Sequence, residues 1–281
     1  MRRKAGILMI GIILILEGIL IPHIFIEKAQ SNAIGNTASQ TDKADSAKQN
    51  VPKNYASVSN GTIKTTAENA AQEDTKNSKS SAKKIAKAKK IYKRNKKILV
   101  LVNADHALDE SYQANLQPIC KGRLSASACL YDSLVQMFAD AAEEGFSYWI
   151  ASVWRSREKQ QKLIDEDVRS AMQRGLSYED ALAETYKETM PAGHSEHETG
   201  LALDILCSGN MNMDASQAKE SGNIWLRENC FRYGFIFRYP KEKEEITGVN
   251  YEPWHLRYVG KEAAAFLKKH DLTLEEYWQL L

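Results

Sequence analysis

The stretch Ser195-Glu196-His197-Glu198-Thr199-Gly200-Leu201-Ala202-Leu203-Asp204 decides how the folded part of this chain is built. Its second half opens an apolar run, Leu201 to Leu206, which predicts a buried strand that carries Asp204. Gly200 lies between His197 and Asp204 and permits a tight turn before that strand. The turn and the strand therefore bring an imidazole and a carboxylate back to one place.

A second segment, Glu252-Pro253-Trp254-His255, lies further along the chain, with His255 51 residues beyond Asp204. Two imidazoles and one carboxylate make a set of three N and O ligands that leaves one coordination position open, as a catalytic zinc requires. Water at that position has a lowered pKa, and a nearby carboxylate can take its proton. Each residue alone is ordinary, but together they predict one Zn²⁺ held by His197, Asp204 and His255, with Glu252 as the base.

The pattern SxHxxGxAxD followed by ExWH resembles the signature of the VanY-type D-alanyl-D-alanine carboxypeptidases, of the Hedgehog/DD-peptidase group of metallopeptidases. The resemblance extends roughly from Ile98 to Val259. It implies zinc bound by the three ligands named above, and it implies that Glu252 is the general base.

The same resemblance singles out Trp154-Arg155-Ser156, with Gln160 a few residues on, since the family shows a YRS segment followed by Gln. It implies that Arg155 serves substrate and transition state, because a guanidinium can clamp a carboxylate or stabilise an oxyanion. Gln160 is the accompanying substrate-binding candidate. Without the resemblance, Arg155 would be an ordinary surface charge.

Two further residues are substrate-binding candidates. Ser195 carries a hydroxyl suited to the terminal carboxylate of a peptide, and Trp254 is expected to line the substrate site. Ser195 is not predicted to be a nucleophile, because no Ser-x-x-Lys motif or nucleophile elbow accompanies it. The chain departs from the family pattern at Glu198, where Gln is common, and at Trp154, where Tyr is usual.

Hydrophobic periodicity predicts an α+β fold, a single domain with a mainly antiparallel sheet flanked by helices, because helices and strands mix without regular βαβ alternation. Strands are expected over residues 98–102, 146–153, 201–206, 235–239 and 251–258, and helices over 133–144, 157–190 with an interruption near Gly175, 224–233, 261–269 and from 273 onward.

The charge of the chain divides at residue 97. Residues 1–97 contain 19 Lys and Arg against 7 Asp and Glu, whereas residues 98–281 contain 19 against 29. Residues 1–27 begin with Arg2-Arg3-Lys4 and continue with an apolar stretch, which predicts a signal-anchor or, as the alternative, a cleaved signal peptide. We expect membrane attachment with the catalytic domain outside the cell, or secretion if the signal is cleaved.

Residues 28–97 are expected to form a disordered, basic stalk, because they offer little apolar surface to offset ordering entropy. Nine of the fifteen residues from Lys83 to Lys97 are Lys or Arg. They suit anionic wall polymers or lipid headgroups, and the alternative is a solvated face or a short basic helix. The acidic domain and the export signal argue against a nucleic-acid partner.

Four cysteines, Cys120, Cys129, Cys207 and Cys230, all fall in residues 98–281, the expected VanY-like zinc carboxypeptidase domain. Cys120 and Cys129 are the local candidates for a disulfide, and free buried thiols are the alternative. Cys207 lies near Asp204 in sequence but is not needed as a ligand.

The leading hypothesis is thus a zinc carboxypeptidase that removes the terminal D-alanine from peptidoglycan stem peptides. Cleavage at an L,D bond, an endopeptidase, and a non-catalytic zinc module that binds the cell wall are the rivals.

Overall fold

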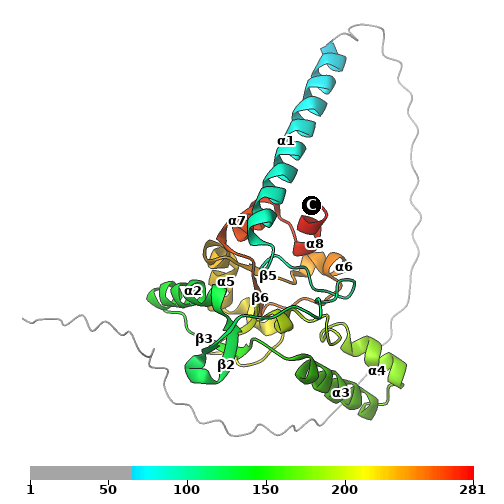
Figure 1. The fold of residues 1–281 in the computed structure, drawn as a ribbon, viewed down its shortest axis with the longest axis vertical. Coiled ribbons are helices and arrows are strands. Elements are labelled where there is room, and N and C mark those ends of the chain that lie inside the picture. The colour runs from blue at the N-terminus through cyan, green and yellow to red at the C-terminus, as the bar shows by residue number, and fades with distance from the viewer. Residues whose placement is uncertain (1–64) are drawn as a thin grey trace, which may run out of the picture. The chain divides into compact units, whose positions relative to one another are not determined.

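The computed structural model describes residues 65–281, and within them side chains from Ser80 onward (Figure 1). The helices are α1 (Thr65–Asn95), α2 (Tyr131–Glu143), α3 (Arg157–Gln173), α4 (Tyr178–Thr185), α5 (Ser221–Asn229), α6 (Glu244–Thr247), α7 (Lys261–His270) and α8 (Leu274–Trp278). The strands are β1 (Leu116–Ile119), β2 (Leu124–Ser127), β3 (Tyr148–Ser152), β4 (Ala202–Cys207), β5 (Phe235–Phe237) and β6 (His255–Tyr258).

A four-stranded sheet of order β3-β4-β6-β5, with every neighbouring pair antiparallel, forms the centre of the fold. The predicted α+β class with an antiparallel sheet is therefore confirmed. Side chains alternate between the two faces of a strand. In β4 and β6, Leu203 and Leu256 lie opposite each other in the main core, while the next pair, Asp204 and His255, points to the other face.

Two apolar cores support this sheet. The larger joins α2, α5 and the hairpin β1–β2 to the apolar face of the sheet, and it includes Met137, Ile205 and Leu226. The second joins α1, α7 and α8, with Phe266 and Tyr277 among its buried members. The face of β4 and β6 that carries polar residues is thus left for a site.

The predicted strand at residues 98–102 is wrong, because Ile98–Val102 is irregular although Leu99, Leu101 and Val102 are buried. Side chains satisfy its backbone carbonyls in place of a neighbouring strand. The guanidinium of Arg257 donates to the carbonyls of Ile98 and Val100 at 3.1 and 2.9 Å, and the indole of Trp278 donates to that of Leu99 at 2.8 Å.

The structure also differs from the expected stalk where the two overlap. Helix α1 includes residues 80–95, and its residues Ala88 and Ile91 are fully buried against the second core. The hydroxyl of Tyr277 donates to the carbonyl of Ala88 at 2.8 Å. Apolar side chains at i and i+3 are enough to dock a helix that is basic elsewhere, so folded structure begins before residue 98. Residues 1–64, with the expected signal segment, lie outside the described residues.

The hairpin β1–β2 was not predicted, and it separates two of the cysteines. Cys120 follows β1 at the turn, whereas Cys129 lies beyond the open end where Leu116 pairs with Ser127. The Cys120–Cys129 disulfide is therefore not formed, and all four cysteines are free thiols. A strand pair keeps the residues at its two ends apart, which spacing along the chain does not reveal.

The remaining elements follow the predictions with shifted ends. The long helix is interrupted at Gly175, as expected, giving α3 and α4. The last strand begins only at His255, so Glu252 and Pro253 belong to the turn before it. Within residues 65–281, none of the helices combines the length and the apolar character needed to span a bilayer.

Candidate active site

His197 lies in a 3₁₀ helix, Glu196–Thr199, which ends at Gly200 with a left-handed backbone (φ 69°). A side chain on Gly200 would meet the Leu116 side chain at 2.8 Å, so glycine is required there for both conformation and space. The Nδ1 atom of His197 lies 2.6 Å from the carbonyl oxygen of Val153. That carbonyl accepts a hydrogen bond from Nδ1–H, which leaves Nε2 directed at Asp204, 3.3 Å from Oδ2.

Asp204 and His255 are cross-strand partners in β4 and β6. Oδ1 of Asp204 lies 3.2 Å from Nδ1 of His255. The tight turn at Gly200 and the sheet register therefore unite the three predicted ligands, and one atom from each lies within 4.8 Å of the others. All three residues are buried.

The donor set fits a zinc ion. Oδ1 of Asp204 is buried without a hydrogen-bond partner in the described part of the chain, and such an atom is costly unless it has a ligand. Two imidazoles and a carboxylate are the ligand types of a catalytic zinc site. His197 would bind through Nε2 and His255 through Nδ1, the nitrogens that face Asp204.

Contacts among these groups shift their protonation. Burial opposes ionisation of Asp204, but the two histidines outweigh it and hold the pKa of that carboxyl well below its usual range. Burial likewise opposes protonation of His255, and the contacts with Asp204, Glu196 and Glu252 outweigh it, raising the pKa of His255 to about 9. In the metal-free protein, a proton on His255 therefore offsets the negative charge of the carboxylates around it.

Glu252 lies beside the ligands without being one of the set. The turn before β6 is closed by hydrogen bonds from the amide of Glu252 to the carbonyl of Tyr239 and from the amide of His255 to that of Glu252, both 3.2 Å. This turn, which includes Pro253, directs the Glu252 side chain to the site, with Oε2 3.5 Å from Nδ1 of His255. In the absence of a metal, burial, partly offset by His255, raises the pKa of Glu252 to about 8.

Arg155 and Gln160 are brought together at the end of β3 and the start of α3. The guanidinium of Arg155 donates to the side-chain oxygen of Gln160 at 2.8 Å and to the hydroxyl of Ser152 at 3.0 Å. Burial lowers the pKa of Arg155, and the nearby carboxylates of Asp204 and Glu252 partly offset this effect. The amide nitrogen of Gln160 donates to the carbonyl of Met190 at 2.6 Å. Gln160 thus holds Arg155, and its substrate-binding role stays a prediction.

The other predicted residues lie around this group. Ser195 is buried directly before the 3₁₀ helix, and its side chain makes no capping hydrogen bond. Trp254 is half-buried between Glu252 and His255, and its carbonyl accepts from the amide of Ile205 at 2.9 Å. Their roles toward a substrate stay predictions.

Glu196 was not among the residues predicted from the sequence, and its side chain is fully buried beside His255. Its Oε1 lies 2.7 Å from Nε of Arg238 and 2.7 Å from Nη1 of Arg257, and its Oε2 lies 3.4 Å from Nε2 of His255. A signal was present in the sequence, since Arg238 and Arg257 interrupt apolar strand-type segments. A buried arginine requires a carboxylate partner, but the pattern does not say which one.

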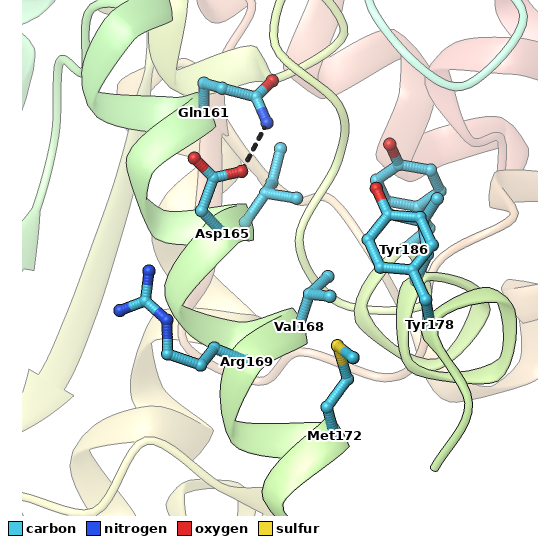
Figure 2. Close-up of a pocket in the computed structure, with 9 residues that line it drawn as sticks. Gln161, Asp165, Val168, Arg169, Met172, Tyr178 and Tyr186 are labelled. Atoms are coloured by element: carbon cyan, nitrogen blue, oxygen red, sulfur yellow. Dashed lines mark hydrogen bonds between the residues drawn. The ribbon is translucent and has the colours of Figure 1, made fainter.

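A groove between α3 and α4 lies apart from these residues (Figure 2). The figure shows Tyr178 and Tyr186 of the α4 segment across from Val168 and Met172 of α3, with Gln161 hydrogen-bonded to Asp165. None of the predicted ligands or substrate-binding residues lines it. The candidate site is therefore defined by the buried ligands and not by this groove.

Comparison with known proteins agrees with this geometry. The family described as "VanY: D-alanyl-D-alanine carboxypeptidase" matches residues 123–261. A D-alanyl-D-alanine carboxypeptidase of Enterococcus faecalis is 39% identical over 183 residues, which cover 64% of this chain and 65% of that protein. The chain thus spans slightly less than two thirds of that relative.

Two solved structures are similar throughout most of their length. A VanY D,D-pentapeptidase from a VanB-type vancomycin-resistance cassette, in complex with Zn(II), is 37% identical, with a TM-score of 0.59, covering 65% of this chain and 99% of that one. The LD-carboxypeptidase LdcB is 35% identical, with a TM-score of 0.57, covering 66% of this chain and 86% of that one.

Proposed function

The chain belongs to the VanY family of D-alanyl-D-alanine carboxypeptidases, and on that premise we propose that it removes the C-terminal D-alanine from peptidoglycan stem peptides. The observation that carries the proposal is the buried cluster of His197, Asp204 and His255 with Glu252 beside it. These are the groups that a metal-dependent peptidase needs, and they are held together by the sheet and two turns.

A zinc ion bound by the three ligands would polarise the scissile carbonyl and lower the pKa of a water molecule. Glu252 is the base that takes the proton of the attacking water and passes it to the leaving amine, since its carboxylate lies next to His255 without belonging to the ligand set. Burial raises the pKa of Glu252 in the metal-free site, which favours retention of the proton between its uptake from water and its delivery to the amine.

Arg155 places a cation near the carboxylates of Asp204 and Glu252. Its bonds to Gln160 and Ser152 fix the guanidinium plane, so that the group is preorganised for the oxyanion or for the terminal carboxylate of the substrate. The hydroxyl of Ser195 and the ring of Trp254 would complete the contacts to the terminal D-residue.

Cleavage at an L,D bond is the second candidate, because the likeness to LdcB is nearly as great as that to the D,D enzyme. The same ligands and base serve either bond. The choice therefore depends on how the terminal residues of the stem fit beside Arg155, which substrate assays decide.

The test is mass spectrometry of defined pentapeptide and tetrapeptide stems incubated with the full-length protein and zinc. Loss of one D-alanine from the pentapeptide supports the proposal. Cleavage of the tetrapeptide alone moves the assignment to an L,D-carboxypeptidase, and cleavage inside the stem to an endopeptidase.

Glu252→Gln is the matched control, because it keeps the shape of the side chain and removes the base. We expect it to retain zinc and to lose activity by about 10²- to 10⁴-fold. Wild-type protein that binds zinc and leaves every stem peptide intact would overturn the enzyme assignment in favour of a wall-binding module.

We further propose that the protein is tethered to the membrane by residues 1–27, with this domain outside the cell, and that α1 contacts anionic wall polymers. Support comes from the exposed side chains of Lys83, Lys87, Lys90 and Arg94, which recur at three- and four-residue spacing on a side of α1 next to its docked face, where Lys87 lies over Phe266 and Arg94 pairs with Glu262.

Binding to purified walls at increasing salt tests the α1 surface. We expect binding that falls with salt and with replacement of those four residues by Gln. Equal binding to walls stripped of anionic polymer would exclude that partner, and binding to anionic lipid vesicles in its place would favour headgroups.

A further inference from the structure

Four charged side chains are buried together behind the metal ligands: Glu196, Arg238, Arg257 and Glu275. Arg238 bridges the two carboxylates, with Nε 2.7 Å from Oε1 of Glu196 and Nη1 2.9 Å from Oε2 of Glu275. Buried ion pairs contribute little net stability relative to apolar packing. Stability alone therefore does not account for this arrangement.

The oxygen of Glu196 that the arginines leave free points at a metal ligand. Oε1 of Glu196 faces Arg238 and Arg257, whereas Oε2 faces Nε2 of His255 at 3.4 Å. Neither Oε2 nor Nε2 has a hydrogen-bond partner in the described part of the chain, and both are buried. Oε2 of Glu196 can therefore accept a hydrogen bond from Nε2–H of His255.

The two histidine ligands are oriented by different means. In His197 the nitrogen that faces away from Asp204 is Nδ1, and it donates a hydrogen bond to the backbone carbonyl of Val153. In His255 the nitrogen that faces away from Asp204 is Nε2, and the carboxylate of Glu196 is the acceptor that faces it. A metal-bound histidine needs an acceptor on its second nitrogen, which fixes the ring and places the proton away from the metal. Only with that proton on Nε2 does Nδ1 present its lone pair toward Asp204.

We propose that Glu196 is a positioning residue for His255: it holds the ring so that Nδ1 faces the metal, and Arg238 and Arg257 hold Glu196. The inference rests on the proposed function only in taking the three ligands as a zinc site. The ion pairs give Glu196 a fixed carboxylate that cannot turn away to water, and Glu275 anchors Arg238 from α8.

The test compares Glu196→Gln with Glu198→Gln in the full-length protein. Both glutamates are buried in the same 3₁₀ helix, but Glu198 bonds the amide of Gly193 and the guanidinium of Arg157 and does not contact His255. Zinc affinity is measured by competition with a chromogenic chelator, and the ligand field by the visible absorption of the Co²⁺ form.

We expect Glu196→Gln to weaken zinc binding by about 10- to 100-fold and to change the Co²⁺ spectrum, with Glu198→Gln within twofold of wild type. A purely structural role would lower the melting temperature in chelator and leave the zinc affinity of the folded fraction unchanged. Zinc affinity of folded Glu196→Gln equal to that of Glu198→Gln therefore overturns the proposal.

Glu196→Asp covers the case in which Glu196→Gln fails to fold, because it keeps the negative charge for the arginines and withdraws it from His255. The same loss of zinc affinity is expected. If neither variant folds, Glu196 is a folding residue and the proposal is overturned. Zinc binding is the readout, so wild-type protein that binds zinc but cleaves no peptide contradicts the proposed function and leaves this test valid.

Discussion

Asp204 and His255 lie directly opposite each other on β4 and β6, with Oδ1 of Asp204 3.2 Å from Nδ1 of His255. A shift of one residue in this pairing would turn one of the two to the apolar face. The pairs Leu203–Leu256 and Phe237–Leu256 fix the register from the core side. Core packing therefore fixes the positions of these two metal ligands relative to each other.

Asp204→Asn tests the carboxylate of this pair. The amide keeps the shape of the side chain but removes the negative charge that attracts the zinc ion. Zinc affinity should therefore fall by more than the roughly 10- to 100-fold that is lost when a residue hydrogen-bonded to a ligand is replaced. Competition with a chromogenic chelator measures it. Asp214→Asn, at an exposed helix cap, is the control, and equal zinc affinity in the two variants would exclude Asp204 as a ligand.

Arg155→Lys tests the preorganised guanidinium. Lysine keeps the positive charge but cannot bond Gln160 and Ser152 in one plane, so kcat should fall by about 10²- to 10³-fold. Zinc affinity should not change, since Arg155 is not a ligand. Arg169→Lys, exposed on α3, is the control. Steady-state kinetics on the preferred stem peptide measure the effect, and unchanged kcat/KM for Arg155→Lys would remove it from the site.

The metal-free protein should lose stability as pH rises from 6 to 9. In the folded state the pKa of His255 is raised to about 9 and that of Glu252 to about 8. Both values exceed those of the unfolded chain, so the folded state binds more protons in this range. The stability that His255 contributes is full below its ordinary pKa, near 6.5, and is lost as pH rises through about 9.

Zinc should reduce this pH dependence, because the metal takes the place of the proton on His255. Melting temperatures measured in chelator and in zinc between pH 6 and 9 check both statements. A melting temperature in chelator that climbs steadily over this range would show that the carboxylates around His255 do not retain its proton.

Ile91→Ala tests whether α1 belongs to the folded unit. Ile91 is fully buried against α7 and α8, so its truncation should cost about 2–5 kcal/mol of unfolding free energy. Chemical denaturation measures this cost, with Lys89→Ala, exposed on the same helix, as the control. A chain that begins at residue 98 should be less stable than one that begins at residue 80, and equal stability would show that α1 docks without stabilising the domain.

The sequence by itself determined the chemistry of the site. Two short motifs contain His197, Asp204, Glu252 and His255, and their residue types and spacing predict a catalytic zinc centre. Gly200 indicates the turn that brings His197 and Asp204 together. A continuous apolar run likewise predicted β4, which is buried along its whole length, and helical periodicity predicted α2 and α7, each of which buries one face.

Tertiary structure alone decided what depends on contacts between distant segments. Glu196 meets Arg238 and Arg257 across 42 and 61 positions, and Ile98–Val102 remains irregular because Arg257 and Trp278 satisfy its carbonyls. Local patterns report which face of a segment is apolar. They do not report which buried charge will neutralise another, because that choice is made when the whole chain packs.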